Sequence, residues 1–144
     1  MDRKSLKKGE FEIIMKERNE TMTIQELYQE IGGDYEQALK VLRMDKLIDK
    51  HIRKLTNNGV VDGLIGAGEG MDPTELYERA HAMKGVCANL GLTAMAAAAS
   101  EIAEEYRPGN SRKLSDAEVK ERIEKISEMY AGTAEGIRKY EAEQ

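Results

Sequence analysis

The sequence predicts an all-α fold, an antiparallel four-helix bundle with short additional N-terminal helices. Only two of the 144 residues are proline, and Ala, Glu, Lys, Leu and Met are frequent, which is typical of helical chains. Long segments repeat apolar residues at intervals of three and four, the spacing of one helix face. Because aromatic residues make up 5% and tryptophan is absent, the core must consist of aliphatic side chains and methionine.

Residues 1–21 are expected to form an N-terminal extension, and residues 22–144 to form the bundle. The extension is rich in lysine and glutamate, with one short apolar group at Phe11, Ile13, Ile14 and Met15. It is either a helix that docks or a frayed, disordered extension, and we assign it no function. Two short helices follow, Ile24 to Ile31 and Tyr35 to Leu42. Gly32-Gly33 ends the first, and Asp34 is a good cap for the second.

A longer helix is predicted from about Met44 to Thr56, with its apolar positions on one face: Met44, Leu47, Ile48, Ile52 and Leu55. His51 lies one turn from both Leu47 and Leu55, so we expect it to pack in the core. Asn57-Asn58-Gly59 breaks or kinks the helix. A weaker helical segment, Val60 to Ala67, leads into a glycine-rich loop from Gly66 to Gly70.

The central helix has the clearest start in the chain. Asp72 can cap it, Pro73 suits its first position and Glu75 can reach back to the cap. Gly91 is a natural left-handed end. The next helix runs from about Thr93 to Tyr106 and is stopped by Pro108-Gly109-Asn110. Five methionines are expected mostly in the core: Met22, Met44, Met83, Met95 and Met129.

The last helix opens with a capping box, Ser115-x-x-Glu118. Apolar residues and one threonine then follow at 4-3-4-3-4 spacing: Val119, Ile123, Ile126, Tyr130, Thr133 and Ile137. Gly132 and Gly136 interrupt it, which argues against a long coiled coil. Four substantial helices joined by short links favour the antiparallel bundle.

The most informative residue is His81, which is predicted to face solvent from the middle of the central helix. At 100° per residue, Leu90, Met83 and Leu76 fall about 180–220° away from it. Gly85 and Ala88 fall within about 40° of His81, and Lys84 about 60° away. A helix normally covers its wet face with long polar side chains, so the small residues around His81 indicate a functional site.

The chemistry of these residues suits a phosphoryl group. A histidine with an ordinary pKa is mostly neutral at pH 7, so a ring nitrogen is available as a nucleophile. Lys84 offers a point charge to an anion. Gly85 costs the helix about 1 kcal/mol relative to alanine, which is reasonable where something approaches the backbone closely. The interpretation is a histidine that accepts and donates a phosphoryl group.

The run His81-x-x-Lys84-Gly85, followed by Asn89-Leu90-Gly91, closely resembles the signature of histidine-containing phosphotransfer (HPt) domains. The stretch from Ile31 to Leu42 is also similar to the opening of stand-alone members, and the resemblance covers residues 22–140. Leu55 departs from the family, in which an aromatic residue is frequent at that position. So does the glycine-rich approach to the central helix, which casts doubt on the continuity of helix there.

The resemblance implies a phosphocarrier in a two-component phosphorelay, a form of signal transduction. His81 would accept the phosphoryl group from a receiver-domain aspartyl phosphate, forming phosphohistidine, and pass it to another receiver aspartate. Lys84 would balance the phosphoryl charge and Gly85 would leave room for it. The residues expected to flank the site or border a docking surface are Tyr77, Glu78, Ala88 and Asn89.

The same resemblance implies the partners: response-regulator receiver domains and a sensor histidine kinase or hybrid kinase. The partner would dock on the helix of His81 and on the one beside it, around Met44 to Leu55. No cofactor is expected in this chain, since Mg²⁺ would come with the receiver. The sequence shows no nucleotide-binding element, so we expect a carrier, not an enzyme, and we expect a monomer.

Composition and sequence pattern argue against several other classes of protein. A net charge of −5 argues against nucleic-acid binding. No 18-residue apolar run and no secretory signal are present, and the single cysteine fits a reducing compartment, so we expect a cytoplasmic protein without a membrane span. No metal site is expected, because His51 and His81 have no convincing third ligand.

Two rival functions stay open. The first is an HPt-like, noncatalytic interaction module that binds receiver domains without phosphotransfer. The second is an enzyme that uses Cys87 with a histidine. Cys87 falls about 240° from His81 on the central helix, which places it on the apolar face. A catalytic cysteine needs exposure and a group that lowers its pKa, so we expect Cys87 to pack in the core.

Overall fold

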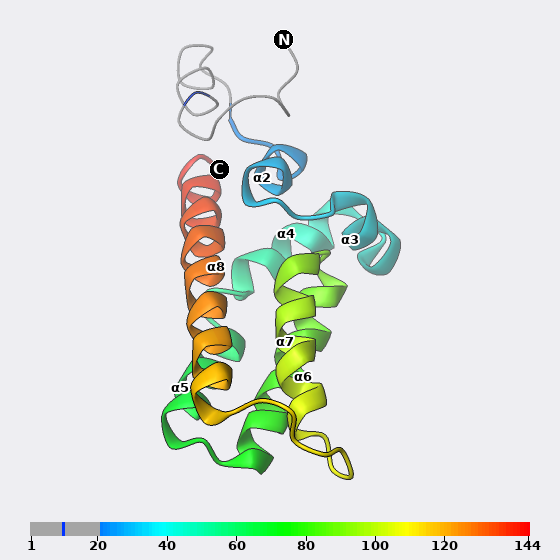
Figure 1. The fold of residues 1–144 in the computed structure, drawn as a ribbon. Helices are drawn as coiled ribbons and strands as arrows, with labels where there is room; N and C mark the ends of the chain where they lie inside the picture. Colours follow the sequence, from blue (N-terminus) through cyan, green and yellow to red (C-terminus); the bar gives the residue numbers. More distant parts are fainter. Residues whose placement is uncertain (1–9, 11–20) are drawn as a thin grey trace.

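The computed structural model is all-helical between residues 21 and 144 (Figure 1). It describes residue 10 and residues 21–144, so both alternatives for the N-terminal extension fall outside the described residues. In the described part of the chain the helices are α2 (Ile24–Ile31), α3 (Tyr35–Leu42), α4 (Asp45–Lys54), α5 (Val60–Gly70), α6 (Pro73–Asn89), α7 (Thr93–Tyr106) and α8 (Asp116–Ala142).

Local capping explains where several helices begin. The Ser115 side chain accepts a hydrogen bond from the backbone N–H of Glu118, whose carboxylate accepts one from the backbone N–H of Ser115. At the start of α6 the Asp72 side chain accepts from the backbone N–H of Glu75 (3.1 Å). The predicted Asp72 cap is confirmed, although it is the backbone of Glu75 that makes this bond. Such caps satisfy N–H groups that have no partner inside the helix.

Most of the core lies among α5, α6, α7 and α8, and α2 and α4 add buried side chains such as Leu27, Ile48 and Ile52. Helix α6 packs against both α7 and α5, and α8 packs against both α5 and α7. In Figure 1, α8 runs alongside α7, with α5 at the lower end of the view. Most buried side chains are aliphatic or sulfur-containing, as composition predicts; the fully buried ones include Leu64, Leu76, Met83, Ile102, Ile126 and Ile137. The expectation of a core without aromatic residues is wrong, because Tyr28, Tyr106 and Tyr140 are buried as well. In the part of the chain described, no helix is both long and apolar enough to cross a membrane.

The glycine-rich segment is helical, so the predicted loop from Gly66 to Gly70 is wrong. Helix α5 continues to Gly70 and ends at Met71, which adopts a left-handed conformation (φ 57°). A Cβ on Gly68 would come within 3.0 Å of Ile123 Cδ1 on α8. The glycine therefore lets α5 and α8 approach closely, and this packing stabilises a segment with poor intrinsic helix propensity.

Two expectations on α4 are wrong. Met44 is 51% exposed, because it is the extended N-cap residue of α4 (φ −151°, ψ 150°) and not a helical position. His51 is exposed as well, although Ile48 and Ile52 of the same helix are fully buried. It stands at the edge of their stripe, where no helix of the described residues covers it. Of the remaining methionines expected in the core, Met22, Met83 and Met95 are buried and Met129 is half-buried.

Helices α2 and α3 hold the C-terminal end of α6. The Tyr28 hydroxyl donates to the carbonyl oxygen of Leu90 (2.6 Å), and the backbone N–H of Asp34 donates to the carbonyl oxygen of Gly91 (2.7 Å). Gly91 is left-handed (φ 68°), as predicted, and a Cβ there would lie 2.1 Å from the Asp34 carbonyl oxygen. Only glycine fits this position, so the junction fixes where α6 ends.

Candidate functional site

His81 lies in the middle of α6 and is exposed. On the same helix Leu76, Ala80, Met83 and Cys87 are fully buried. The predicted orientation of the helix is therefore confirmed: its apolar face packs into the core, and the opposite face presents the histidine to solvent. A ring nitrogen placed this way can meet a macromolecular partner without any rearrangement of the core.

The imidazole of His81 stacks on the ring of Tyr77, one turn earlier on α6. The ring centroids are 5.7 Å apart and the planes differ by 22°. Tyr77 is half-buried and packs against the core cluster. The tyrosine ring therefore contacts both the core and the histidine, and it gives the imidazole a neighbour on one face.

The surface beside His81 is formed by small residues and carries no long side chain at Gly85 or Ala88. Gly85 and Ala88 are exposed, and a Cβ built on Gly85 would meet no heavy atom within 4 Å. Nothing in the described residues therefore requires a glycine at position 85 for packing. Alanine would suit the helix better by about 1 kcal/mol, so the reason for Gly85 lies outside the described fold.

The other predicted site residues surround this patch. Glu78 and Asn89 are exposed, and Asn89 is the last residue of α6. Lys84 is half-buried, and within residues 10 and 21–144 it forms no ion pair that would neutralise its ammonium group. The structure thus places an exposed imidazole, a cation and an open patch on one helix within two turns.

Cys87 lies on the opposite side of α6 and is fully buried. Burial raises the pKa of its thiol to about 12, because a thiolate is poorly solvated in the core. The thiol is therefore protonated at neutral pH. This confirms the predicted packing role and removes the chemical basis for a Cys87 nucleophile.

The helices that pack on α6 differ from the expected neighbour. The segment around Met44 to Leu55 was expected beside the His81 helix, but α4 packs mainly against α2, α3 and α8, whereas α7, α5 and α3 pack on α6. On the α5 side, the Arg79 side chain lies over Gly63 (3.1 Å from a Cβ built there). The neighbours of the His81 helix are therefore α7, α5 and α3.

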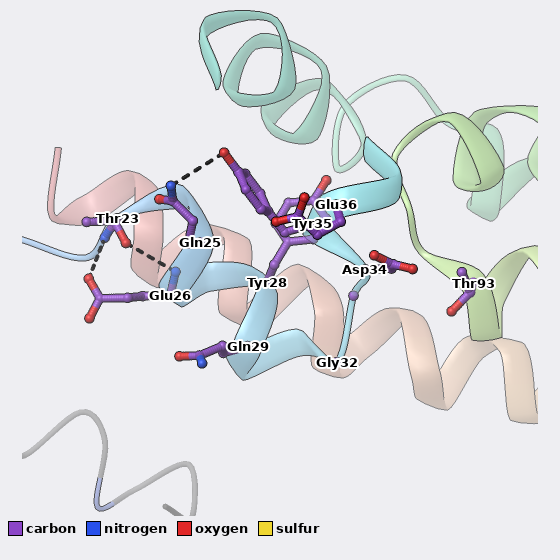
Figure 2. A pocket seen from close by; sticks show the side chains of 11 residues that line it. Thr23, Gln25, Glu26, Tyr28, Gln29, Gly32, Asp34, Tyr35, Glu36 and Thr93 are labelled. Carbon is purple, nitrogen blue, oxygen red and sulfur yellow. Dashed lines mark hydrogen bonds between the residues drawn. The ribbon is translucent and has the colours of Figure 1, made fainter. Parts of the chain in front are cut away.

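A polar pocket at the junction of α2 and α3 is a separate feature (Figure 2). Several of its residues form hydrogen bonds within the junction: Thr23 and Glu26 form the capping box of α2, and Gln25 donates to the Tyr35 hydroxyl (3.4 Å). Figure 2 shows these hydrogen bonds as dashed lines. The pocket therefore serves the junction that holds α6 and contains none of the predicted site residues.

Tyr77 lies closer to His81 than the sequence predicted. The sequence predicted a residue at the border of a docking surface, whereas in the structure the Tyr77 ring stacks on the His81 ring. The signal was present, because an aromatic residue four positions before a histidine on a helix lies next to it. What the spacing could not show is that the tyrosine is held by the core and is therefore a firm support.

The family model described as Hpt domain matches residues 22–132, which is more than half of the chain. Comparisons with curated proteins and with solved structures gave no significant match. Hpt domains are phosphocarrier modules of phosphorelays and not catalytic enzymes, and they interact with receiver domains and kinases. On the evidence of the family match, this chain belongs to the Hpt domain family.

Proposed function

We propose that this Hpt protein accepts a phosphoryl group on His81 from a receiver-domain aspartyl phosphate and passes it to the aspartate of another receiver. One observation carries the proposal: His81 is exposed in mid-helix, beside a glycine that no packing contact requires. An open backbone next to a nucleophile suits the approach of a second protein that carries the phosphoryl group.

The transfer is a nucleophilic displacement at phosphorus. The ring nitrogen of His81 distal to the backbone supplies its lone pair, and an N–P bond forms. The bond from phosphorus to the aspartyl oxygen breaks, and its electron pair returns to the receiver carboxylate. Donation to the next receiver is the same step in reverse. Lys84 balances the charge of the phosphoryl oxygens, while the receiver supplies Mg²⁺ and most of the electrostatic stabilisation.

Docking is proposed on the exposed face of α6 and on α3, which packs against it. The two large apolar side chains that are exposed in the described part of the chain, Val41 and Met44, lie at the junction of α3 and α4. They provide apolar contact area, and Glu78, Ala88 and Asn89 border the histidine. A modest, transient interface suits a relay that must release each partner.

The proposal also covers the arrangement of the helices, the oligomeric state and the cellular location. We propose an antiparallel four-helix bundle made of α5 to α8, within a domain spanning residues 22–144. The sequence predicted this bundle with the segment from about Met44 to Thr56 as one of its four substantial helices, and we assign that place to α5 instead. The protein is proposed to act as a cytoplasmic monomer between a sensor or hybrid kinase and its response regulators. It needs no cofactor of its own, because the metal arrives with the receiver.

Phosphotransfer from a phosphorylated receiver tests the proposal. The expected product is one acid-labile, alkali-stable phosphate per chain, and it should disappear in His81→Gln. His51→Gln is the matched control, because His51 is the second histidine and is also exposed on a helix. It should accept phosphate like the wild type. Receiver binding without transfer to the wild-type protein would instead identify a noncatalytic interaction module.

A further inference from the structure

The ring of Tyr77 stacks on His81 and restricts the orientation of the imidazole. An exposed histidine normally samples several rotamers, and its χ2 angle is broadly distributed. Here one face of the imidazole lies on a ring that is half-buried against the core (centroids 5.7 Å apart, planes 22° apart). Two rings in this offset-stacked relation attract each other, so the tyrosine restricts how the imidazole is presented.

We propose that Tyr77 is a positioning residue for His81: its ring holds the imidazole in the orientation that meets the phosphoryl group and stabilises the cationic ring of phosphohistidine. The inference rests on the proposed function, because it assigns a role within that transfer.

The first part of the effect is orientation. A transfer between two proteins requires the nucleophilic nitrogen to lie in line with phosphorus at the moment of docking, and fixing such geometry beforehand lowers the barrier. The stack supplies this order before any partner binds. Because Tyr77 is held by the core and His81 is exposed, the restraint acts from the tyrosine on the histidine.

The second part of the effect is electrostatic and concerns the charge on the phosphorylated His81 ring. The neutral imidazole has a proton on one nitrogen and a lone pair on the other. When the lone pair forms the N–P bond, the aspartyl P–O bond breaks and its electrons leave with the receiver carboxylate. The imidazole ring then has a substituent on both nitrogens and carries a positive charge. The electron-rich face of a tyrosine ring attracts such a cation, which at an exposed site favours the phosphorylated form by about two- to fivefold.

The test compares Tyr77→Phe, which keeps the aromatic face, with Tyr77→Leu and Tyr77→Met, which remove it but keep an apolar side chain. Tyr130→Leu is the control, because Tyr130 is a half-buried tyrosine on α8. The first readout is the NMR signal of the His81 ring protons, which a stacked aromatic ring shifts upfield. The chain has only two histidines, so His51→Gln assigns the signals. The second readout is the equilibrium constant for phosphoryl exchange with a phosphorylated receiver.

Tyr77→Phe and Tyr130→Leu should retain the upfield shift and the wild-type equilibrium. Tyr77→Leu and Tyr77→Met should lose the shift and favour phosphohistidine about two- to fivefold less. Wild-type exchange in both aliphatic variants would overturn the inference, and so would an equal loss in Tyr77→Phe. Failure of the wild-type protein to accept phosphate is a different result: it would reject the proposed function, and with it the inference that rests on it.

Discussion

Replacing Gly85 with alanine should make the protein more stable and a poorer phosphoryl acceptor at the same time. A Cβ at this position meets no heavy atom within 4 Å, so alanine adds no clash inside the molecule. It removes the conformational cost of a helical glycine, about 0.5–1 kcal/mol. For a domain of this size, that gain raises the melting temperature by about 2–4 °C. Thermal unfolding followed by circular dichroism at 222 nm measures it.

The same methyl group stands on the exposed face next to His81, where the receiver must approach. We expect the initial rate of transfer from a phosphorylated receiver to fall roughly tenfold or more, because small displacements of reacting groups are costly. Gly132→Ala is the matched control: Gly132 is an exposed glycine inside α8, and its Cβ also meets nothing within 4 Å. It should give the same stabilisation with unchanged transfer.

Two results would refute this reasoning. Unfolding of Gly85→Ala at a lower temperature than the wild type would show that the glycine serves packing after all. A stabilised Gly85→Ala protein that transfers at the wild-type rate would show that the bare patch beside His81 has no role in receiver approach.

Three further predictions concern the fold that holds the site. Gly91→Ala should lower the free energy of unfolding by more than about 1 kcal/mol, measured by urea denaturation, since its Cβ would lie 2.1 Å from the Asp34 carbonyl oxygen. Burial tends to raise the pKa of Glu105, but hydrogen bonds from the Leu114 N–H, the Arg112 side chain and the Lys113 N–H hold this pKa below its usual value. The ionised carboxylate therefore stabilises the folded state, and this contribution should disappear as pH falls below about 4. Glu105→Gln should flatten that dependence of the unfolding free energy on pH. Cys87 should react with a thiol reagent only as fast as the protein unfolds, because it is fully buried; rapid labelling of the native protein would contradict this.

The facing of His81 was predictable because it depends on local geometry. A helix has a fixed angle per residue, so the positions of Leu76, Met83 and Cys87 were enough to show which side of α6 is buried. The starts of α6 and α8 were predictable for a related reason, since each cap joins residues three apart. The roles of Lys84 and Gly85 stay proposals, because a static fold shows exposure and open space but not transfer.

The errors share a physical cause. Gly66 to Gly70 was expected to be a loop because glycine is a poor helix former, but the close approach of Gly68 to Ile123 stabilises the helix. His51 was expected to pack because its own helix has apolar residues on either side, yet within residues 21–144 no other helix covers it. In each case the outcome depends on a partner that is distant in sequence.

The sequence by itself therefore determined the helical class, most helix boundaries and the presentation of His81, because caps and periodicity act within a few residues along the chain. Only the tertiary structure decided which helices surround α6, how far α5 extends, and what supports the site. The bond from Tyr28 to Leu90 joins residues 62 positions apart, and the support of the Tyr77 ring by the core depends on several helices at once. Such contacts form only when distant segments meet, so no local pattern could have shown them.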